Sequence, residues 1–359
     1  MSESDFSKYR VTKLPRSVAV GHGVLDDIAS ICADVGLRGS ALLVQDATTE
    51  KIAGGRVSDS LKKGGYTVHS FIITDADMEN VKAVMEKARQ VHADFLLGIG
   101  GGRSIDVAKC ASSEIGGMPF ISVPTAASHD GIVSGAASIT VDGKKKSISA
   151  HPPMIVVADT EIIANAPYAL LSAGYGDIIS NKTAVLDWEL ANREKGEEIS
   201  SYAIALSAMT GEIMLRHADQ MHEGDEKSAW MVVKALTASG VAMSIAGSSR
   251  PASGAEHLFS HALDRIAEKP GLHGHQCAIG SIMMLKLHGG DWEGFRERMK
   301  IAGLPTSAGE IGLSEDEVVK ALLMAPEIRP ERYTVLHKLG LSREEAEELA
   351  RETGVIGGE

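Results

Sequence analysis

Residues 94–106 read DFLLGIGGGRSID, an apolar run followed at once by three consecutive glycines and a polar helix start. The apolar run at 94–99 is typical of a short buried strand, and the pattern at 104–112 predicts a helix. Glycines at such a junction let a phosphate group approach backbone N–H groups, and the N-terminus of the following helix adds a partial positive charge. The stretch therefore predicts a strand–loop–helix unit that binds phosphate.

The glycine loop differs from the usual dinucleotide-binding pattern GxGxxG, because Arg103 stands where that pattern has a small residue. A tight turn without a ligand is the alternative interpretation. Three consecutive glycines exceed what an ordinary turn requires, so we favour the phosphate site.

The sequence around this unit alternates between strand and helix signals. Short apolar runs predict further strands at 40–45, 67–73 and 120–123. Helical patterns precede and follow them at 49–63 and 77–92. Short apolar strands separated by helices indicate a parallel sheet that is covered on both faces. Residues 136–149 alternate between polar and apolar side chains instead, and Asp142-Gly143 at their centre predicts a β-hairpin.

Helical patterns dominate after about residue 159, where strand signals become rare. They cover residues 168–193, 200–221, 226–249 and 252–268. Ser314 and Glu317 have the spacing of a capping box, as do Ser342 and Glu345. These two boxes predict the first turns of two more helices.

A chain of 359 residues is long enough for two domains and too long for one ordinary core. The change in pattern places the boundary near Asn165-Ala166-Pro167. We therefore predict an α/β domain with a Rossmann-like, mostly parallel sheet at residues 1–165, and an all-α domain at residues 166–359.

Charge and composition exclude several classes of protein. The formal net charge of −12 opposes nonspecific binding to nucleic acid or anionic membranes. The three cysteines are far apart and form no CxxC, which argues against a disulfide framework or a cysteine zinc site. The polar start is unlike a signal peptide, and no apolar run approaches the roughly 18 to 20 residues of a membrane span. We expect a cytoplasmic protein with no nucleic-acid partner and no stable membrane insertion.

Metal-ligating side chains gather in three segments of the predicted helical domain. The candidates are Asp177, His257, His261, His273 and His275. The His-x-x-x-His spacing places His257 and His261 on one helix face, but the metalloprotease motif needs an intervening glutamate that is absent here. Two imidazoles and one carboxylate suit a zinc ion with an open position for substrate or water. Histidines without a metal, on the surface or satisfied in the core, are the alternative.

Polar residues follow two of the other predicted strands. Loops at the carboxyl ends of parallel strands line the ligand crevice, so Thr125, Ser128 and Ser134 are candidate cofactor contacts. Asp130 in the same loop is a candidate contact for a substrate hydroxyl. Asp46 ends the strand at 40–45 and is a candidate contact for an adenosine ribose. A solvated loop and an ordinary turn residue are the respective alternatives.

The order of these motifs resembles the superfamily of glycerol dehydrogenases, iron-containing alcohol dehydrogenases and dehydroquinate synthases. The shared motifs are a GGG-x-S-x-D loop, a PT-x-x-S loop, a GxxD segment, an HxxxH helix and a final LHG. The phrases that carry the resemblance are GGRSID at 101–106, VPTAASHD at 123–130, SNKTA at 180–184, SRPASGAEH at 249–257 and RPERYT at 329–334. The resemblance covers most of the chain, roughly from Leu14 to Leu339.

The resemblance implies a role for each matching position in the helical domain. Asp177, His257 and His273 match the metal ligands of the superfamily, while His261 and Asp130 match substrate contacts. Histidine at 275 departs from the residue that commonly follows LHG, so it is a second candidate for the ligand role of His273.

The resemblance also implies two groups of cofactor contacts. The pyrophosphate site matches Gly100, Gly101, Gly102, Arg103, Ser104 and Asp106. The nicotinamide side matches Thr125, Ser128 and Ser134. NAD and NADP are equally compatible with the sequence.

The phrases are closest to members that interconvert dihydroxyacetone phosphate and sn-glycerol 1-phosphate for membrane lipid synthesis. The resemblance thus implies an NAD(P)H-dependent oxidoreductase with one zinc ion, which also forms homo-oligomers. Asp177 and His261 are the expected catalytic residues, with His261 relaying a proton or orienting a hydroxyl. An unphosphorylated polyol as substrate, a lyase like dehydroquinate synthase and a non-catalytic nucleotide-binding module are the alternatives.

A phosphorylated substrate needs a cation on an otherwise acidic protein. Arg250, seven residues before His257, and Lys182, five after Asp177, are the candidates. A solvated lysine and an arginine in a surface turn are the alternatives. Lys144–Lys146 in the predicted hairpin are interpreted as a solvated face.

Overall fold

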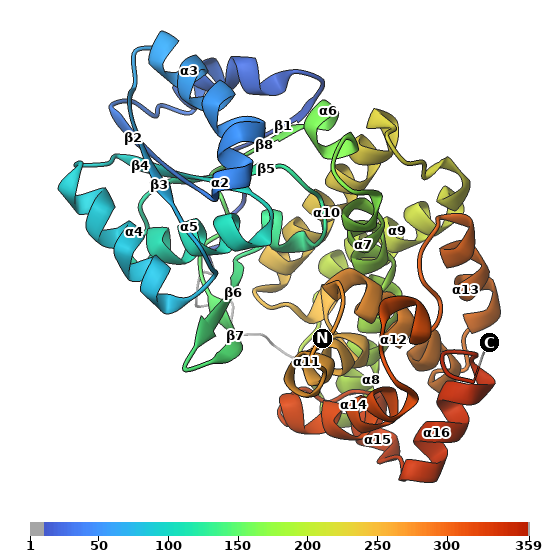
Figure 1. Cartoon of the computed structure of the whole chain (residues 1–359). Helices are drawn as coiled ribbons and strands as arrows, with labels where there is room; N and C mark the ends of the chain where they lie inside the picture. The colour runs from blue at the N-terminus through green and yellow to red at the C-terminus, as the bar shows by residue number, and fades with distance from the viewer. Residues whose placement is uncertain (1–10, 358–359) are drawn as a thin grey trace.

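The computed structural model describes residues 11–357, and its first half is built around one parallel sheet (Figure 1). Within the described residues the sheet has six strands in the order β1–β8–β5–β4–β2–β3. They are β1 (Ser17–Gly21), β2 (Ser40–Gln45), β3 (Thr67–Ile72), β4 (Phe95–Gly100), β5 (Phe120–Pro124) and β8 (Ile155–Asp159). Four of these strands confirm the prediction. β1 and β8 were not predicted, because an apolar run of five residues shows little periodicity.

Helices cover both faces of the sheet, as the apolar strands predicted. They are α1 (Ile28–Asp34), α2 (Ala47–Thr49), α3 (Gly55–Lys63), α4 (Met78–Gln90) and α5 (Gly102–Glu114), with a π-helical turn at Glu50–Gly54. Neighbouring strand residues point to opposite faces, so Leu43 and Leu97 join the core under α1 and α3. Leu42 and Leu96 join the core under α4 and α5. The predicted single helix at 49–63 is thus two helices joined by the π-helical turn.

The predicted hairpin is confirmed. β6 (Ala136–Val141) and β7 (Lys144–Ser149) pair in antiparallel register, with Ala136 opposite Ser149. Both turn residues have positive φ, 53° at Asp142 and 72° at Gly143, as a two-residue type I′ turn requires. In Figure 1 the hairpin extends from the α/β half toward the helical half.

The second half is helical, as predicted. Its helices are α6 (Thr160–Ala164), α7 (Tyr168–Ile179), α8 (Asn181–Lys195), α9 (Ser201–Arg216), α10 (Glu226–Ala246), α11 (Ala255–Ile266), α12 (His273–Leu287), α13 (Trp292–Ile301), α14 (Glu315–Ile328), α15 (Val335–Leu339) and α16 (Arg343–Glu352). Both capping boxes are confirmed, at the start of α14 and of α16. The predicted helix at 168–193 is instead two helices that meet at Ser180, whose hydroxyl donates to the backbone carbonyl of Asp177 at 2.6 Å.

One helix, α10, is long and apolar enough to cross a membrane by length and composition alone. It has 21 residues with a mean hydropathy of 1.5. By length and composition, the expectation that no apolar stretch is long enough for a membrane span is therefore wrong. A core helix of a folded domain passes the same test. In the structure α10 packs against α9 and α7, and its Val232, Val233 and Leu236 are buried in the core.

The two halves share one hydrophobic core. Leu96 and Ile105 from the α/β half belong to the same cluster of buried side chains as Phe259 and Met283 from the helical half. The division at residues 165 and 166 falls between α6 and α7 and stays a prediction.

Candidate active site

The helices α7 and α12 approach each other at glycines. A Cβ atom on Gly274 would overlap the backbone carbonyl of Ala173, and one on Gly176 would lie 2.6 Å from the carbonyl oxygen of Gly274. No side chain therefore fits between the two helices at this point. This close contact brings Asp177, near the end of α7, next to His273, the first residue of α12.

Four side chains converge beside this helix contact. Donor atoms of Asp177, His257, His273 and Cys277 all lie within 4.8 Å of one another. Asp177 Oδ1 lies 3.5 Å from His257 Nε2 and 3.7 Å from His273 Nε2. Among the described residues this buried oxygen has no hydrogen-bond partner, which is costly unless another group satisfies it. The donor set fits a divalent cation, and Cys277 is a fourth donor that the sequence did not indicate.

Neighbouring side chains fix the orientation of this donor set. Glu256 Oε1 lies 2.9 Å from His257 Nδ1, and Ser260 Oγ lies 2.9 Å from His273 Nδ1. The Nε2 atoms of both rings are therefore the ones left to face Asp177. Asp177 Oδ2 in turn accepts a hydrogen bond from the backbone N–H of Asp130 at 2.8 Å. Such outer contacts are typical of metal-ligating histidines and carboxylates.

His275 points away from this cluster. Its Nε2 lies 2.9 Å from the hydroxyl of Ser172, and both residues are buried. Burial lowers the pKa of His275 to about 4, so the ring is neutral in the folded protein. The geometry therefore favours His273 over His275 as a metal ligand.

Three titratable side chains in and beside the cluster, His273, His261 and Asp130, have shifted pKa values. Burial and the positive charge of His257 lower the pKa of His273 to about 3, so its imidazole is in the neutral form that binds metals. Burial and the neighbouring His273 and His257 also lower the pKa of His261 well below its usual range. Burial and the negative charge of Asp177 raise the pKa of Asp130 to about 7. Perturbed groups of this kind cluster at functional sites.

The glycine loop lies between β4 and α5, where the sequence placed it. Gly100 has φ of 143°, a conformation that side chains rarely adopt. Gly101 begins α5 without any side-chain cap, so the first backbone N–H groups of this 13-residue helix are open to a ligand. The Ser104 hydroxyl is buried and has no hydrogen-bond partner in the described part of the chain. A Cβ on Gly102 would lie 2.4 Å from His129 Nε2, so a larger residue there would require the His129 side chain to move.

A buried lysine connects the first turns of α5 to the backbone at Gly131 and Ala136. Lys109 on α5 donates to Asp106 Oδ1 at 3.1 Å and to the carbonyl oxygens of Gly131 and Ala136, both at 2.6 Å. Asp106 Oδ2 accepts from the backbone N–H of Ser138 at 3.0 Å. Asp106 thus holds the loop in place within the protein, although its side chain also lines the cleft described next.

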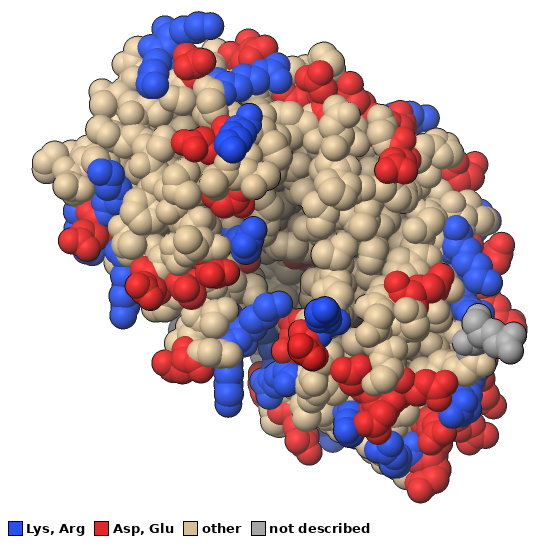
Figure 2. Space-filling view, in the orientation of Figure 1, with Lys and Arg blue, Asp and Glu red and all other residues tan. Residues whose placement is uncertain are grey.

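One cleft of about 530 Å³ connects the glycine loop with the metal-type cluster. Figure 2 shows the surface hollowed between the α/β half and the helical half. From the first half it is lined by Gly101, Gly102, Arg103, Asp106, Ser128, His129, Asp130 and Ser134. From the second half it is lined by Ser249, Ser253, His257, His261, His273 and Arg329. Gly102 and His273, which are 171 positions apart along the chain, therefore line the same cleft.

Two of the predicted cofactor contacts lie beside the cleft. Thr125 is buried, and its backbone N–H donates to Gly100 O at 3.0 Å, so it supports the glycine loop. Asp46 caps α2 by accepting from the N–H groups of Thr48 and Thr49, both at 2.9 Å, and its second oxygen lies 3.7 Å from Arg103 Nη2. Asp46 is thus a helix cap rather than an ordinary turn residue, and its ribose role stays a prediction.

In the structure both predicted phosphate ligands face carboxylates of the protein. Arg250 is buried, with its guanidinium bound to both carboxylate oxygens of Glu197 and to the carbonyl oxygen of Tyr333 at 3.0 Å. The Nζ atom of Lys182 lies 3.6 Å from Glu212 Oε2. Neither residue lines the cleft. Their proximity to Asp177 and His257 in the sequence did not determine where their side chains point.

Replacement of Arg250 by alanine is accordingly expected to lower stability. The change removes a bidentate ion pair and leaves the half-buried Glu197 carboxylate without its partner. We expect the free energy of unfolding to fall by about 2 to 4 kcal/mol, measured by urea denaturation. Arg250→Ala with unchanged stability would show that the buried pair contributes nothing.

Sequence reasoning missed several residues of the site, namely Cys277, Glu256, Ser260, His129, Lys109 and Arg329. Two of them had a signal in the chain. Glu256 directly precedes His257, and His129 lies inside the polar loop that was singled out. Arg329 was noted only as the first residue of the phrase RPERYT at 329–334. No local pattern relates it to His261, which lies 68 positions earlier in the chain.

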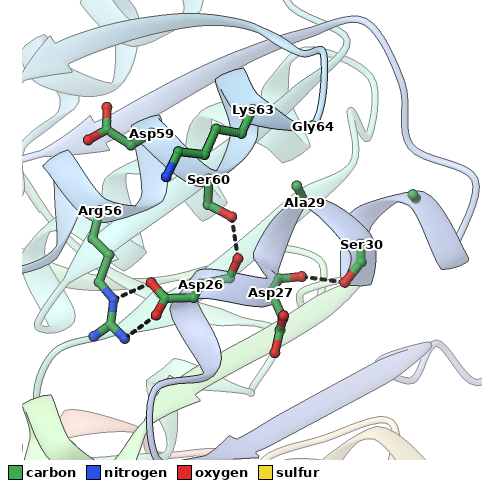
Figure 3. Close-up of a pocket in the computed structure, with 10 residues that line it drawn as sticks. Asp26, Asp27, Ala29, Ser30, Arg56, Asp59, Ser60, Lys63 and Gly64 are labelled. Carbon is green, nitrogen blue, oxygen red and sulfur yellow. Dashed lines mark hydrogen bonds and ion pairs between the residues drawn. The ribbon is translucent and has the colours of Figure 1, made fainter.

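A second hollow, of about 570 Å³, lies on the surface of the α/β half (Figure 3). Arg56 and Asp26 form its main ion pair, with Arg56 Nε 2.6 Å from Asp26 Oδ1. None of the predicted site residues lines it. Its residues form a solvated ion-pair surface and contribute no metal-type cluster.

Comparisons with known proteins agree with this geometry. The family described as iron-containing alcohol dehydrogenase matches residues 18–167. Glycerol-1-phosphate dehydrogenase [NAD(P)+] of Methanosarcina mazei is 54% identical over 96% of this chain and 96% of its own length. The protein of the same name from Methanosarcina acetivorans is 55% identical over the same shares.

Solved structures are similar in fold. Glycerol dehydrogenase from Schizosaccharomyces pombe has a TM-score of 0.81 at 19% identity, covering 96% of this chain and 90% of that chain. Sulfoacetaldehyde reductase from Bifidobacterium kashiwanohense, solved with NAD+, has a TM-score of 0.75 at 16% identity, covering 98% and 100%. These likenesses support the two-part architecture, with the sheet in the first part and helices in the second.

Proposed function

The chain belongs to the glycerol-1-phosphate dehydrogenase family, and from this premise we propose that it is a metal-dependent oxidoreductase. The reaction is the interconversion of dihydroxyacetone phosphate and sn-glycerol 1-phosphate, with NADH or NADPH as the hydride donor, for membrane lipid synthesis. The observation that carries the proposal is the single cleft. It joins an open glycine-loop helix end to a buried, unsatisfied carboxylate flanked by two imidazoles.

The proposed metal ligands are Asp177, His257 and His273. Two neutral imidazoles and one carboxylate suit zinc, although iron and other divalent ions accept the same donors. A bound cation of this kind supplies Lewis acidity to the oxygen of the reacting carbonyl or hydroxyl. The protein holds these ligands in a fixed orientation through Glu256 and Ser260.

The proposed cofactor site is the glycine loop. The backbone N–H groups at Gly101 and Gly102 and the start of α5 receive the pyrophosphate. Ser128 and Ser134 line the cleft on the nicotinamide side, and Asp46 faces the adenosine ribose. Hydride transfer from the nicotinamide to the carbonyl carbon leaves the carbonyl oxygen to take one proton, so the residues of the cleft serve mainly to position the two reactants.

Two residues are proposed to handle the hydroxyl groups and the proton. Asp130 and His261 both line the cleft. Asp130 lies beside Asp177, to which its backbone N–H donates at 2.8 Å, and its carboxyl group can hold and release a proton. His261, one helical turn after His257, is neutral and orients a terminal hydroxyl of the substrate.

We also propose that the protein is a cytoplasmic homo-oligomer. All three cysteines are buried free thiols, which suits a reducing compartment. Large exposed apolar side chains lie on two helices that pack together, with Tyr202 and Met209 on α9 and Trp230 and Ile245 on α10. A second copy that covers these side chains would remove them from water. Light scattering is expected to give a multiple of the chain mass, and a single-chain mass would contradict the oligomer.

The deciding experiment is a spectrophotometric assay with dihydroxyacetone phosphate, each reduced cofactor and metal analysis of the same sample. Net oxidation of NADH or NADPH that depends on bound metal is the expected result. Equal or faster turnover of unphosphorylated dihydroxyacetone would favour a polyol dehydrogenase. A reaction with no net change in the cofactor absorbance would favour a lyase.

A further inference from the structure

Three arginines gather at the helical end of the cleft, where the 3-10 helix η5 (Arg250–Ala252) meets the end of α14. They are Arg250, Arg329 and Arg332. Within the described part of the chain, the ion pair of this cluster joins Arg250 to Glu197. The carboxylates of Glu197 and Glu256 both act on Arg332, so three guanidinium groups share two carboxylates on a protein whose formal net charge is −12.

Arg332 holds the wall of the cleft at this point. Its Nη1 donates to the carbonyl oxygen of Ser253 at 2.6 Å, and its Nη2 donates to the Ser249 hydroxyl at 2.9 Å. Both serines line the cleft. Burial and the positive charges of Arg329 and Arg250 lower the pKa of Arg332 to about 10, against the opposing effect of the carboxylates of Glu197 and Glu256.

Arg329 is the member of the cluster that lines the cleft. It is half-buried at the C-terminal end of α14, and no ion pair joins it to a carboxylate within residues 11–357. The lysines that line the cleft come from the hairpin, and both are near carboxylates. Lys145 Nζ lies 3.5 Å from Asp264 Oδ1, and Lys146 Nζ lies 4.0 Å from Asp142 Oδ2.

We propose that Arg329 binds the phosphate group of the substrate, in an anion subsite that Ser249 and Ser253 complete. The proposal rests on the proposed function, because it assigns the phosphorylated end of that substrate. A guanidinium offers two parallel N–H donors to a phosphate, and serine hydroxyls add neutral donors. His261 also lines the cleft, and its imidazole stacks on that of His273 with 5.9 Å between the ring centroids, so in this proposal the phosphate lies at Arg329 and the carbonyl near Asp177.

The cofactor is a second source of phosphate groups in the same cleft, and the experiment separates the two. The pyrophosphate site lies at the start of α5, in the other half of the molecule. Arg329→Ala is expected to raise KM for dihydroxyacetone phosphate by about 10- to 100-fold, the loss of one or two charge-assisted hydrogen bonds. KM for NADH and NADPH should stay within about threefold of wild type.

The substrate without phosphate provides the matched comparison. Arg329→Ala is expected to leave kcat/KM for unphosphorylated dihydroxyacetone unchanged, because that ketone has nothing to lose at the subsite. Lys182→Ala is the control variant, since Lys182 faces Glu212 outside the cleft and should leave KM for both ketones unchanged. An equal rise in KM for both ketones in Arg329→Ala, or no rise for dihydroxyacetone phosphate, would overturn the proposal.

Inorganic phosphate tests the subsite without turnover. Phosphate should compete with dihydroxyacetone phosphate and should raise the Tm of the wild-type protein, and both effects should be lost in Arg329→Ala and weakened in Arg329→Lys. Wild-type protein that binds phosphate through Arg329 but does not reduce dihydroxyacetone phosphate would refute the proposed reaction and keep the anion subsite. Wild-type protein that reduces dihydroxyacetone phosphate while its Tm and kinetics ignore inorganic phosphate would refute the subsite alone.

Discussion

Asp177→Ala is expected to lose the bound metal and to lower kcat/KM for dihydroxyacetone phosphate by about 10³-fold or more. The carboxylate supplies the proposed anionic ligand, and its Oδ1 is the buried atom that both imidazoles face. A loss of several kcal/mol of charge stabilisation in the transition state corresponds to a change of this size. Metal content by elemental analysis and steady-state kinetics on the same preparation provide the measurement.

The same variant is expected to keep its fold. Burial raises the pKa of Asp177, but the adjacent His257 and His273 lower it to about 2, so the carboxylate is ionised beside His257 in the folded protein. Its removal also leaves the backbone N–H of Asp130 without its acceptor, so we expect the metal-free variant to keep the circular dichroism spectrum of metal-free wild type and to melt at a lower temperature.

His275→Gln is the control for the ligand assignment. Its ring bonds to Ser172 rather than to the donor set, so this variant should retain stoichiometric metal. Full metal content in Asp177→Ala would remove that residue from the ligand set, and loss of metal in His275→Gln would restore His275 as a ligand.

Gly274→Ala is expected to destabilise the protein by about 3 kcal/mol or more and to impair metal binding at the same time. The new methyl group would overlap the backbone carbonyl of Ala173, and backbone atoms in a packed helix pair cannot move aside cheaply. Separation of α7 from α12 would also increase the distance between Asp177 and His273, which come from these two helices. Urea denaturation of the metal-free protein and zinc titration measure the two effects separately.

Gly309→Ala is the matched control for this substitution. A Cβ at Gly309 would meet no atom within 4 Å, and its φ is not in the left-handed region. We expect its free energy of unfolding to stay within about 0.5 kcal/mol of wild type. A Gly274→Ala protein with wild-type stability and zinc affinity would mean that the glycine contact does not hold the two ligands together.

Local signals in the sequence were sufficient for much of the fold. The apolar runs of β2, β3, β4 and β5, the Asp142-Gly143 turn and the two capping boxes each depend on residues within a few positions of one another. The glycine loop was found for the same reason, since its three glycines adjoin the strand and the helix that they connect. The strand order and the contact between α7 and α12 had no such local signal.

Three of the four donor residues, Asp177, His257 and His273, could be named from the sequence, but their grouping could not be derived from local pattern. Their positions span almost a hundred residues, and the resemblance to a known superfamily provided the grouping before the structure did. His273 and His275 are separated by one residue, so local pattern cannot tell which of the two faces Asp177. The hydrogen bond of His275 to Ser172 favours His273, and that bond exists only because α12 packs on α7.

The phosphate contact marks the limit of what the chain alone determined. The sequence by itself determined that an acidic protein with a glycine loop and metal-type residues would need a local cation, and it suggested Arg250 and Lys182 because they are near the ligands along the chain. Tertiary structure alone decided that Arg250 is occupied by Glu197 and that Arg329 reaches the cleft instead. The physical reason is that spacing along the chain sets the direction of side chains within one helix, whereas the packing of distant helices decides which charges are paired and which remain open to a ligand.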